Sequence, residues 1–203
     1  MVKRRCYDRH DPGDGLRGYI WHLDVAMNVF DSSAAELEKL NERVLELSRR
    51  RKDSPEATAA WREAAQAFHA NYDRLAFPGG LAREFELLRN GDREAIELAV
   101  RYLEANPWYF RSGYHKAVIL KFLKRHPLTQ EQCARIREVI LERVRGKPVR
   151  EMRAYGRIAP RVTNEQFEAE LLAINEKSHR DAARSAGWIL EYLRAAKAAS
   201  KSS

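Results

Sequence analysis

Hydrophobic residues recur along this chain at intervals of three and four, the spacing that places them on one face of an α-helix. The first series begins at Leu16 and continues to Phe30, so we expect a helix over residues 16–30. Ser33 followed by Glu36 matches a capping box. This pair predicts that a second helix begins there and continues to a basic run of arginines and lysine.

A third helix and a shorter one are predicted downstream. Ser54 is a good N-cap and Pro55 suits the first helical position. The sequence FPGG at 77–80 predicts the end of that helix, because its proline and glycines break helical geometry. A short helical segment over residues 81–88 follows, and the NGD sequence at 90–92 predicts a turn.

Two similar motifs mark the C-terminal half, LTQEQC at 128–133 and VTNEQF at 162–167. Their threonines, Thr129 and Thr163, are 34 residues apart. In each motif we expect the threonine to cap a helix and the glutamine three residues later to accept a bond from the threonine's own N–H. Asp92 opens a similar helix 37 residues before Thr129, without the reciprocal glutamine. The spacing lies in the range of helical repeats.

Each of these helix starts is followed about 20 residues later by a second amphipathic segment, at residues 113–125, 149–160 and 181–196. With these paired segments, residues 91–197 resemble the HEAT-like family of stacked helical hairpins. The resemblance implies about three helix pairs in an α-α superhelix, with the second helices lining the concave side. The alternative is an ordinary helical bundle in which two good N-caps coincide.

The composition favours helix, since Ala, Leu, Glu and Arg dominate and only 10 Gly and 7 Pro occur among 203 residues. We therefore predict an all-α fold, an N-terminal helical bundle followed by about three HEAT-like helix pairs. The expected organisation is a mobile basic arm, a bundle, the repeats and a disordered tail, with bounds 1–13, 14–90, 91–197 and 198–203.

The chain lacks the signals of several protein classes. It has neither a run of 18 apolar residues nor a leader-type N-terminus, so we expect a cytoplasmic protein without a membrane span. Cys6 and Cys133 are too few for a disulfide framework and have no zinc-site spacing, so we predict no metal site. No nucleotide-binding, zincin or hydrolase-elbow motif occurs, and we predict no cofactor.

Positive charge is concentrated in two windows. Residues 108–126 carry a net charge of +5 and residues 143–161 carry +6, which together exceed the +8 of the whole chain. The first helices of the pairs are slightly acidic. An anionic partner is therefore expected to meet the second helices.

Arg150, Arg153, Arg157 and Arg161 recur at intervals of three and four, which aligns them on one helical face unless Pro160 ends the helix and leaves Arg161 in a turn. Arginine suits phosphate because its planar fork can donate two hydrogen bonds. The alternative is a solvated face whose cations pair with neighbouring acidic helices. The predicted anion-binding residues are Arg111, Lys116, Lys121, Lys124, Arg150, Arg153, Arg157 and Arg161.

The run NPWYFRSGYHK at 106–116 combines aromatic and basic residues. Trp108 and Tyr109 are candidates for stacking on nucleobases. Aromatic residues at such junctions commonly seal the interface between hairpins, so burial of these rings is the competing and stronger expectation.

Two enzyme classes are the alternatives. Segments 17–22 and 62–69 match the arginine-to-histidine spacing that resembles the ribonuclease motif of HEPN-type bundles, with His22 and His69 as the implied histidines. The basic cleft also resembles HEAT-like DNA alkyl-base glycosylases, whose tryptophans would correspond by residue type alone to Trp61, Trp108 and Trp188. We assign no catalytic residue.

We therefore expect a non-enzymatic binding or adaptor module. Its basic face would meet a nucleic-acid backbone or an acidic protein. Either partner is compatible with a protein that is a subunit of a larger assembly.

Overall fold

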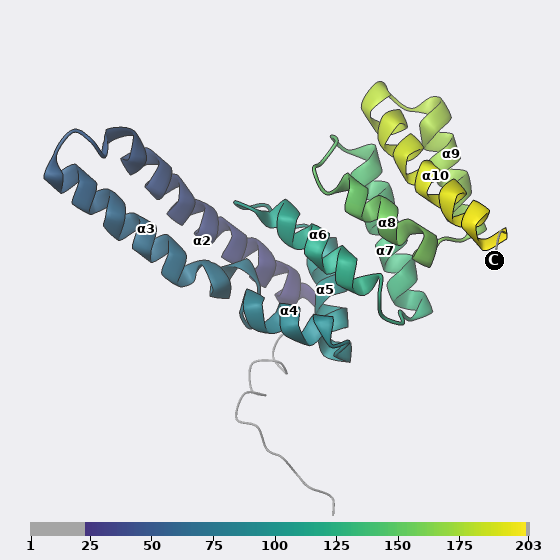
Figure 1. Ribbon diagram of the computed structural model, residues 1–203, viewed down its shortest axis with the longest axis horizontal. Helices are drawn as coiled ribbons and strands as arrows, with labels where there is room; N and C mark the ends of the chain where they lie inside the picture. The colour runs from purple at the N-terminus through teal and green to yellow at the C-terminus, as the bar shows by residue number, and fades with distance from the viewer. Residues whose placement is uncertain (1–22, 202–203) are drawn as a thin grey trace, which may run out of the picture.

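The computed structural model describes residues 23–201, and its described side chains run from residue 29 to residue 200. This part of the chain contains helices and no strand, which confirms the all-α prediction. The predicted arm at 1–13, the start of the predicted first helix, Cys6 and His22 lie outside the described residues. The helices in chain order (Figure 1) are α2 (Leu23–Arg50), α3 (Pro55–Ala76), α4 (Leu81–Arg89), α5 (Arg93–Ala105), α6 (Ser112–Leu123), α7 (Gln130–Arg145), α8 (Met152–Val162), α9 (Glu165–Lys177) and α10 (Arg180–Lys201).

Helices α2 and α3 form a long antiparallel hairpin at one end of the molecule (Figure 1). The predicted break at Ser33 is wrong, because α2 continues through this residue. Phe30, Ala34 and Leu37 are all buried, so one apolar face runs unbroken across the predicted cap. Tertiary packing of this face outweighs the local capping signal. The predicted cap of α3 is confirmed, since the Ser54 side chain accepts a hydrogen bond from the N–H of Ala57.

Short breaks separate the hairpin from the rest of the chain. Helix α3 ends at Ala76 before the FPGG sequence, as predicted, and Gly79 and Gly80 there adopt φ angles of 88° and 93°. Gly91 in the NGD turn has a φ of 79°. These left-handed conformations are strained for residues with a Cβ, which accounts for glycine at these positions.

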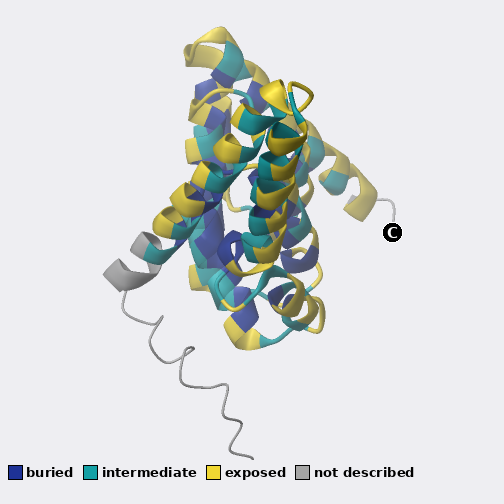
Figure 2. Cartoon of the chain, turned by 90° about the vertical axis from the view of Figure 1, so that its left-hand side faces the viewer, coloured by how far each residue is buried: buried dark blue, intermediate teal, exposed yellow. Residues whose placement is uncertain are grey.

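The remaining helices form two layers. Helices α5, α7 and α9 contact one another in series, and α6, α8 and α10 form a second contacting series. Contacts within α5–α6, α7–α8 and α9–α10 join the layers, as the ribbon in Figure 1 shows. One cluster of buried residues extends from Phe30 on α2 to Leu193 on α10. Figure 2, viewed from the hairpin end, shows buried residues between the helices and exposed residues outside.

The predicted cap of α7 is confirmed in full: Thr129 Oγ1 accepts from the N–H of Gln132, and Gln132 Oε1 accepts from the N–H of Thr129. The corresponding prediction for α9 is wrong, because Asn164 is the N-cap and its Oδ1 accepts from the N–H of Phe167. Asparagine is at least as good a cap as threonine, so the helix begins one residue later. Asp92 caps α5 as predicted.

Two predicted helix ends also differ from the structure. Helix α8 includes Pro160 and continues to Val162, so Arg161 lies in its last turn. Pro160 has no N–H to donate to the carbonyl of Gly156, so the helix lacks this one intrahelical bond in its last turn. Helix α10 continues to Lys201, so residues 198–201 of the predicted disordered tail are helical.

Candidate anion-binding surface

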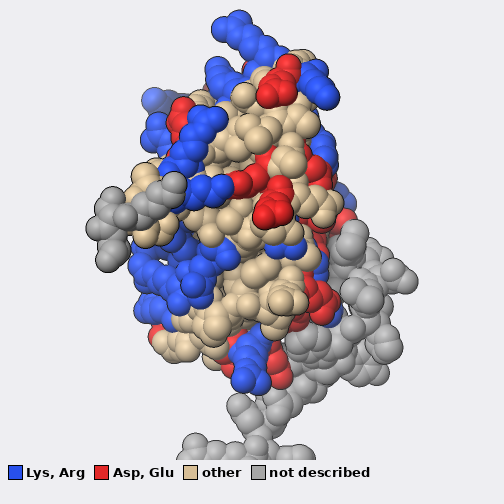
Figure 3. Space-filling model, turned by 90° about the vertical axis from the view of Figure 1, so that its right-hand side faces the viewer, with Lys and Arg blue, Asp and Glu red and all other residues tan. Residues whose placement is uncertain are grey.

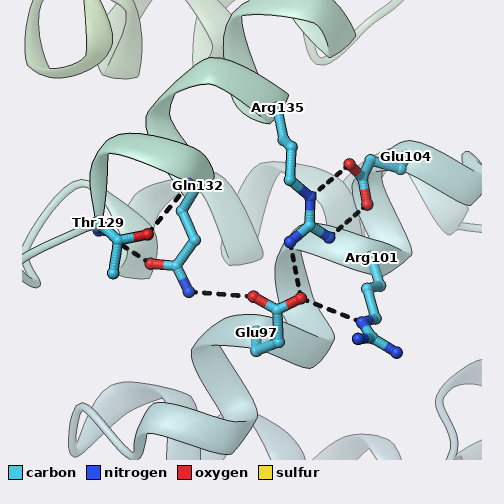
Figure 4. A network of polar contacts seen from close by, with 6 residues as sticks. All are labelled: Glu97, Arg101, Glu104, Thr129, Gln132 and Arg135. Carbon is cyan, nitrogen blue, oxygen red and sulfur yellow. Dashed lines mark hydrogen bonds and ion pairs between the residues drawn. The ribbon is translucent and has the colours of Figure 1, made fainter. Parts of the chain in front are cut away.

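Carboxylates on α5 are neutralised by arginines in their own layer. Arg135 on α7 donates to both oxygens of Glu104 and to Oε1 of Glu97, and Arg101 donates to the same Glu97 oxygen (Figure 4). Gln132 links this network to the α7 cap by donating to Glu97 Oε2 at 3.1 Å. Burial raises the pKa of Glu97, but these hydrogen bonds outweigh burial and leave it below the usual carboxyl value. Glu97 and Glu104 on α5 are therefore paired within their own layer, whereas Glu168 on α9 pairs with Lys197 on α10.

The α6–α8 layer carries a groove of about 580 Å³ between its two helices. Its apolar walls come from small and aliphatic side chains on both helices, Ala117, Val118, Leu120 and Ala154. Four cations complete the lining, Lys121, Lys124, Arg125 and Arg157. We call this set of eight residues the basic groove. Three of its residues, Lys121, Lys124 and Arg157, are among the predicted anion-binding residues. Arg125 lies in the basic window 108–126 but is not among them.

The cations of this layer have no carboxylate partner among the described residues. Lys121, Lys124, Arg153 and Arg157 are exposed, and none forms an ion pair in the part of the chain that the structure describes. Figure 3, viewed from the α9–α10 end, shows Lys and Arg side chains gathered on the left, with Asp and Glu mainly at the centre and right. In this view the largest group of cations has few carboxylates within it, although Lys and Arg also occur at the top and bottom.

Helix α8 extends this cationic face beyond the groove. Arg153 lines a neighbouring cavity of about 510 Å³, which it shares with residues of α10 that include Trp188 and Glu191. At the other end of the helix, Arg161 Nη2 lies 3.4 Å from the carbonyl oxygen of His126. Within the predicted stripe, Arg157 therefore lines the basic groove and Arg153 lines the neighbouring cavity, while Arg150 lies in the turn before α8.

Lys116 does not belong to this surface. Its side chain is buried, with a relative exposure of 3 %, and Nζ donates to Asn106 Oδ1 at 2.6 Å. Burial lowers the Lys116 pKa to about 8, against the opposing effect of Glu151 and together with that of Arg143. The prediction of Lys116 as an anion-binding residue is wrong, because α6 turns this position towards Asn106 in the preceding loop.

Trp108 and Tyr109 have opposite environments. Tyr109 is buried, as expected for a sealing residue, and its hydroxyl donates to the Ala76 carbonyl at 2.9 Å. The same hydroxyl lies 2.6 Å from the Tyr102 hydroxyl and 2.7 Å from His115 Nδ1. Stacking by Tyr109 on a ligand is therefore excluded, whereas Trp108 is 74 % exposed.

A third hollow, of about 330 Å³, lies where the loop before α6 meets α2. Arg111 lies over the Phe110 ring at 5.6 Å, and Arg150 lies over the Tyr114 ring at 4.4 Å. We call this hollow the aromatic cleft. Its lining residues are Glu38, Asn41, Trp108, Tyr109, Phe110, Arg111, Ser112, Gly113, Tyr114 and Arg150. The sequence run did not single out Phe110 and Tyr114, because their exposure depends on the fold.

The described residues implied by the enzyme resemblances lie at separate places in the fold, and Arg17 and His22 lie outside the described residues. Arg62 and His69 are two turns apart on α3, and His69 is exposed with its ring against Phe68. Trp61 lies under Arg51 near the tip of the hairpin, while Trp188 lies on α10, so these tryptophans do not share a cleft with Trp108. Within residues 23–201, no group of three His, Cys, Asp or Glu side chains is placed to hold a metal ion.

Comparison of the chain with protein-family models, with curated proteins and with solved structures gives no match. Among the described helices, none combines the length and apolar character needed to cross a membrane.

Proposed function

We propose that this protein is a helical-repeat binding module whose basic groove and adjoining α8 face bind a polyanion. In this proposal α5–α6, α7–α8 and α9–α10 are HEAT-like pairs, and α6, α8 and α10 form the binding layer. The serial contacts within each layer support the repeat arrangement. The function is binding rather than catalysis.

One observation carries the proposal. Arg135 in the first layer is paired with two carboxylates, while the exposed cations Lys121 and Arg157 on α6 and α8 have no described carboxylate partner. Unpaired cations close together repel one another, and that repulsion is relieved when an anion binds. A surface of this kind favours a partner that carries several negative charges at short intervals.

A nucleic-acid backbone fits this requirement better than an acidic protein. Its charges are regularly spaced, and arginine can bind each phosphate through two hydrogen bonds. Three or four phosphates neutralised by the groove and Arg153 would give a slope of about −2 to −3 in a plot of log affinity against log salt. Because such a slope counts released counterions, it distinguishes a multivalent charge interface from an apolar one.

The test is a salt series of fluorescence anisotropy titrations with labelled DNA and RNA oligonucleotides. Lys121→Glu combined with Arg157→Glu should weaken binding about tenfold or more and flatten the slope. Arg62→Glu is the matched control for one charge reversal, because Arg62 is exposed on α3 in the distant hairpin. Salt-independent binding, or equal losses for groove and control variants per reversed charge, would contradict the proposal.

A further inference from the structure

We propose that the aromatic cleft receives unpaired nucleobases, which makes single-stranded nucleic acid the partner of this surface. The inference deepens the proposed function and rests on it. Trp108 and Tyr114 would supply the stacking faces, and Arg150 would bind the adjoining backbone.

Three large aromatic side chains are exposed within seven residues of the chain. The relative exposures are 74 % for Trp108, 48 % for Phe110 and 49 % for Tyr114. Water contact with so much aromatic surface is unfavourable, and a bound planar ring would relieve it. A cluster of this kind marks a binding surface more often than a single exposed ring does.

The segment that carries these rings is held in place. The N–H of Phe110 donates to Glu38 Oε2 at 3.2 Å, and the Tyr72 hydroxyl donates to the Phe110 carbonyl at 3.0 Å. The backbone is left-handed at Asn106, the C-cap of α5, and at Arg111, the N-cap of α6 between Phe110 and Tyr114, with φ of 49° and 73°. Such conformations persist only where surrounding contacts enforce them, and they are concentrated at functional sites. These backbone contacts therefore hold the segment so that its aromatic rings stay exposed.

Charge decides which flat ligand the cleft accepts. An aromatic cleft can also bind a quaternary ammonium group, but Arg111 and Arg150 already lie over the Phe110 and Tyr114 rings. Their charge disfavours a cationic ligand and favours an anionic one. The carboxylate in the lining, Glu38, accepts from the Phe110 N–H and from Asn41 Nδ2, which partly satisfies its oxygens. Planar rings joined by anionic groups describe a nucleotide chain.

The segment from Arg150 into α8 links the cleft to the basic face. Arg150 lines the cleft, Arg153 follows three residues later, and Arg157 lines the basic groove. Arg150 lies in the turn just before α8, and at the helical rise Arg153 and Arg157 on α8 are about 6 Å apart along the axis. A strand whose phosphates follow this stripe can place bases in the cleft. Paired bases are stacked inside a duplex, so a duplex can use the cations but cannot reach the rings.

The experiment compares three labelled probes of equal length at one salt concentration: a single-stranded thymidine oligomer, an abasic oligomer with the same backbone, and a duplex. RNA and DNA versions of the base-containing strand distinguish the two sugars. The protein should bind the base-containing single strand at least about five-fold more tightly than either other probe. Equal affinity for the base-containing and abasic strands would overturn the inference but leave the proposed function intact. If none of the probes binds in a salt-dependent manner, both this inference and the proposed function are overturned.

Variants locate the effect. Trp108→Ala and Tyr114→Ala should each weaken binding of the base-containing strand at least about five-fold and leave the abasic strand unchanged. Trp61→Ala is the matched control, because Trp61 also has an arginine over its ring but lies on the distant hairpin. The exposure of Trp108 makes misfolding an inadequate explanation, and circular dichroism checks this. Unchanged affinity in the Trp108 and Tyr114 variants, or equal losses for both strands, would contradict stacking.

Discussion

The guanidinium of Arg135 on α7 binds both carboxylate oxygens of Glu104 on α5, with an Nε–Oε1 distance of 2.7 Å and an Nη2–Oε2 distance of 2.6 Å. Its third nitrogen donates to Glu97 Oε1 at 2.7 Å. One arginine therefore joins two consecutive helices of the same layer through two carboxylates. The carboxylates of Glu97 and Glu104 thus join α5 to α7. Because they are bound to Arg135, they do not neutralise the cations of the α6–α8 layer.

Replacing Arg135 with alanine should lower the free energy of unfolding by about 1–3 kcal/mol, since Glu97 and Glu104 would remain partly buried without their main partner. Urea denaturation measures the change. Arg145→Ala is the control, because its pair with Glu170 is more exposed and should contribute less than about 1 kcal/mol. Equal losses in the two variants would show that the Arg135 network adds nothing beyond an ordinary surface pair.

The corrected cap of α9 gives a second prediction. Asn164→Ala and Thr129→Ala should each cost about 1 kcal/mol, because each removes the oxygen that accepts a hydrogen bond from the third N–H of its helix. Thr163→Ala should cost distinctly less, since Thr163 Oγ1 is buried without a described hydrogen-bond partner. Thermal unfolding of the three variants checks this order. A Thr163 loss as large as that of Thr129 would restore threonine as the α9 cap.

These caps show what local sequence determines. Amphipathic spacing and breakers located the described helices, because both depend on residues close together in the chain. The break predicted at Ser33 failed because burial of Phe30, Ala34 and Leu37 depends on packing against distant segments, as the contact of the Phe30 ring with Tyr102 shows. The sequence shows that a residue such as Ser33 is favourable at a helix N-cap, but it does not show the tertiary packing that continues the helix through that residue.

The candidate surface likewise combines features that local sequence predicts with features that depend on tertiary packing. Charge windows correctly located the cations that line the basic groove, since helical periodicity is local. Lys116 has the same side-chain chemistry as Lys121, yet the fold buries one and exposes the other. Likewise, Trp108 and Tyr109 are adjacent, and the partners that bury Tyr109 come from α3, α5 and α6. Whether such a side chain is buried or exposed depends on contacts with residues that are distant in the sequence.

A third prediction concerns the close approach of α8 and α10. A Cβ added at Gly156 would lie 2.3 Å from a ring carbon of Tyr192, so Gly156→Ala requires that ring or its helix to move. We expect a loss of about 1–2 kcal/mol, with overpacking exceeding the gain in helix propensity. Gly187→Ala is the matched helical control, since its Cβ would meet only Asn175 Oδ1 at 3.2 Å. Urea denaturation should show Gly187→Ala near neutral or stabilising; a stabilised Gly156 variant would contradict the tight approach.

The buried histidine gives a prediction about pH. Burial, together with the smaller effect of the nearby Arg111 charge, lowers the pKa of His115 from 6.5 to about 4. The Tyr109 hydroxyl donates to the Ala76 carbonyl, so it can only accept from His115 Nδ1–H. His115 Nε2 faces the Tyr72 hydroxyl at 3.4 Å. The Tyr109 contact places the proton of the neutral imidazole on Nδ1, and burial opposes protonation of Nε2, to which the Tyr72 hydroxyl does not donate because its proton goes to the Phe110 carbonyl.

Because the folded pKa is below the unfolded one, the unfolded chain takes up a proton first as the pH falls from 6.5 towards 4. The stability associated with His115 is complete above pH 6.5 and is lost across this interval. Between pH 7 and pH 5, the loss should be about 2 kcal/mol. Denaturation of His115→Gln at both pH values should lack this loss, while His69→Gln, altered at an exposed position, should retain it. A pH dependence equal in wild type and His115→Gln would show that the buried imidazole does not resist protonation in the folded protein.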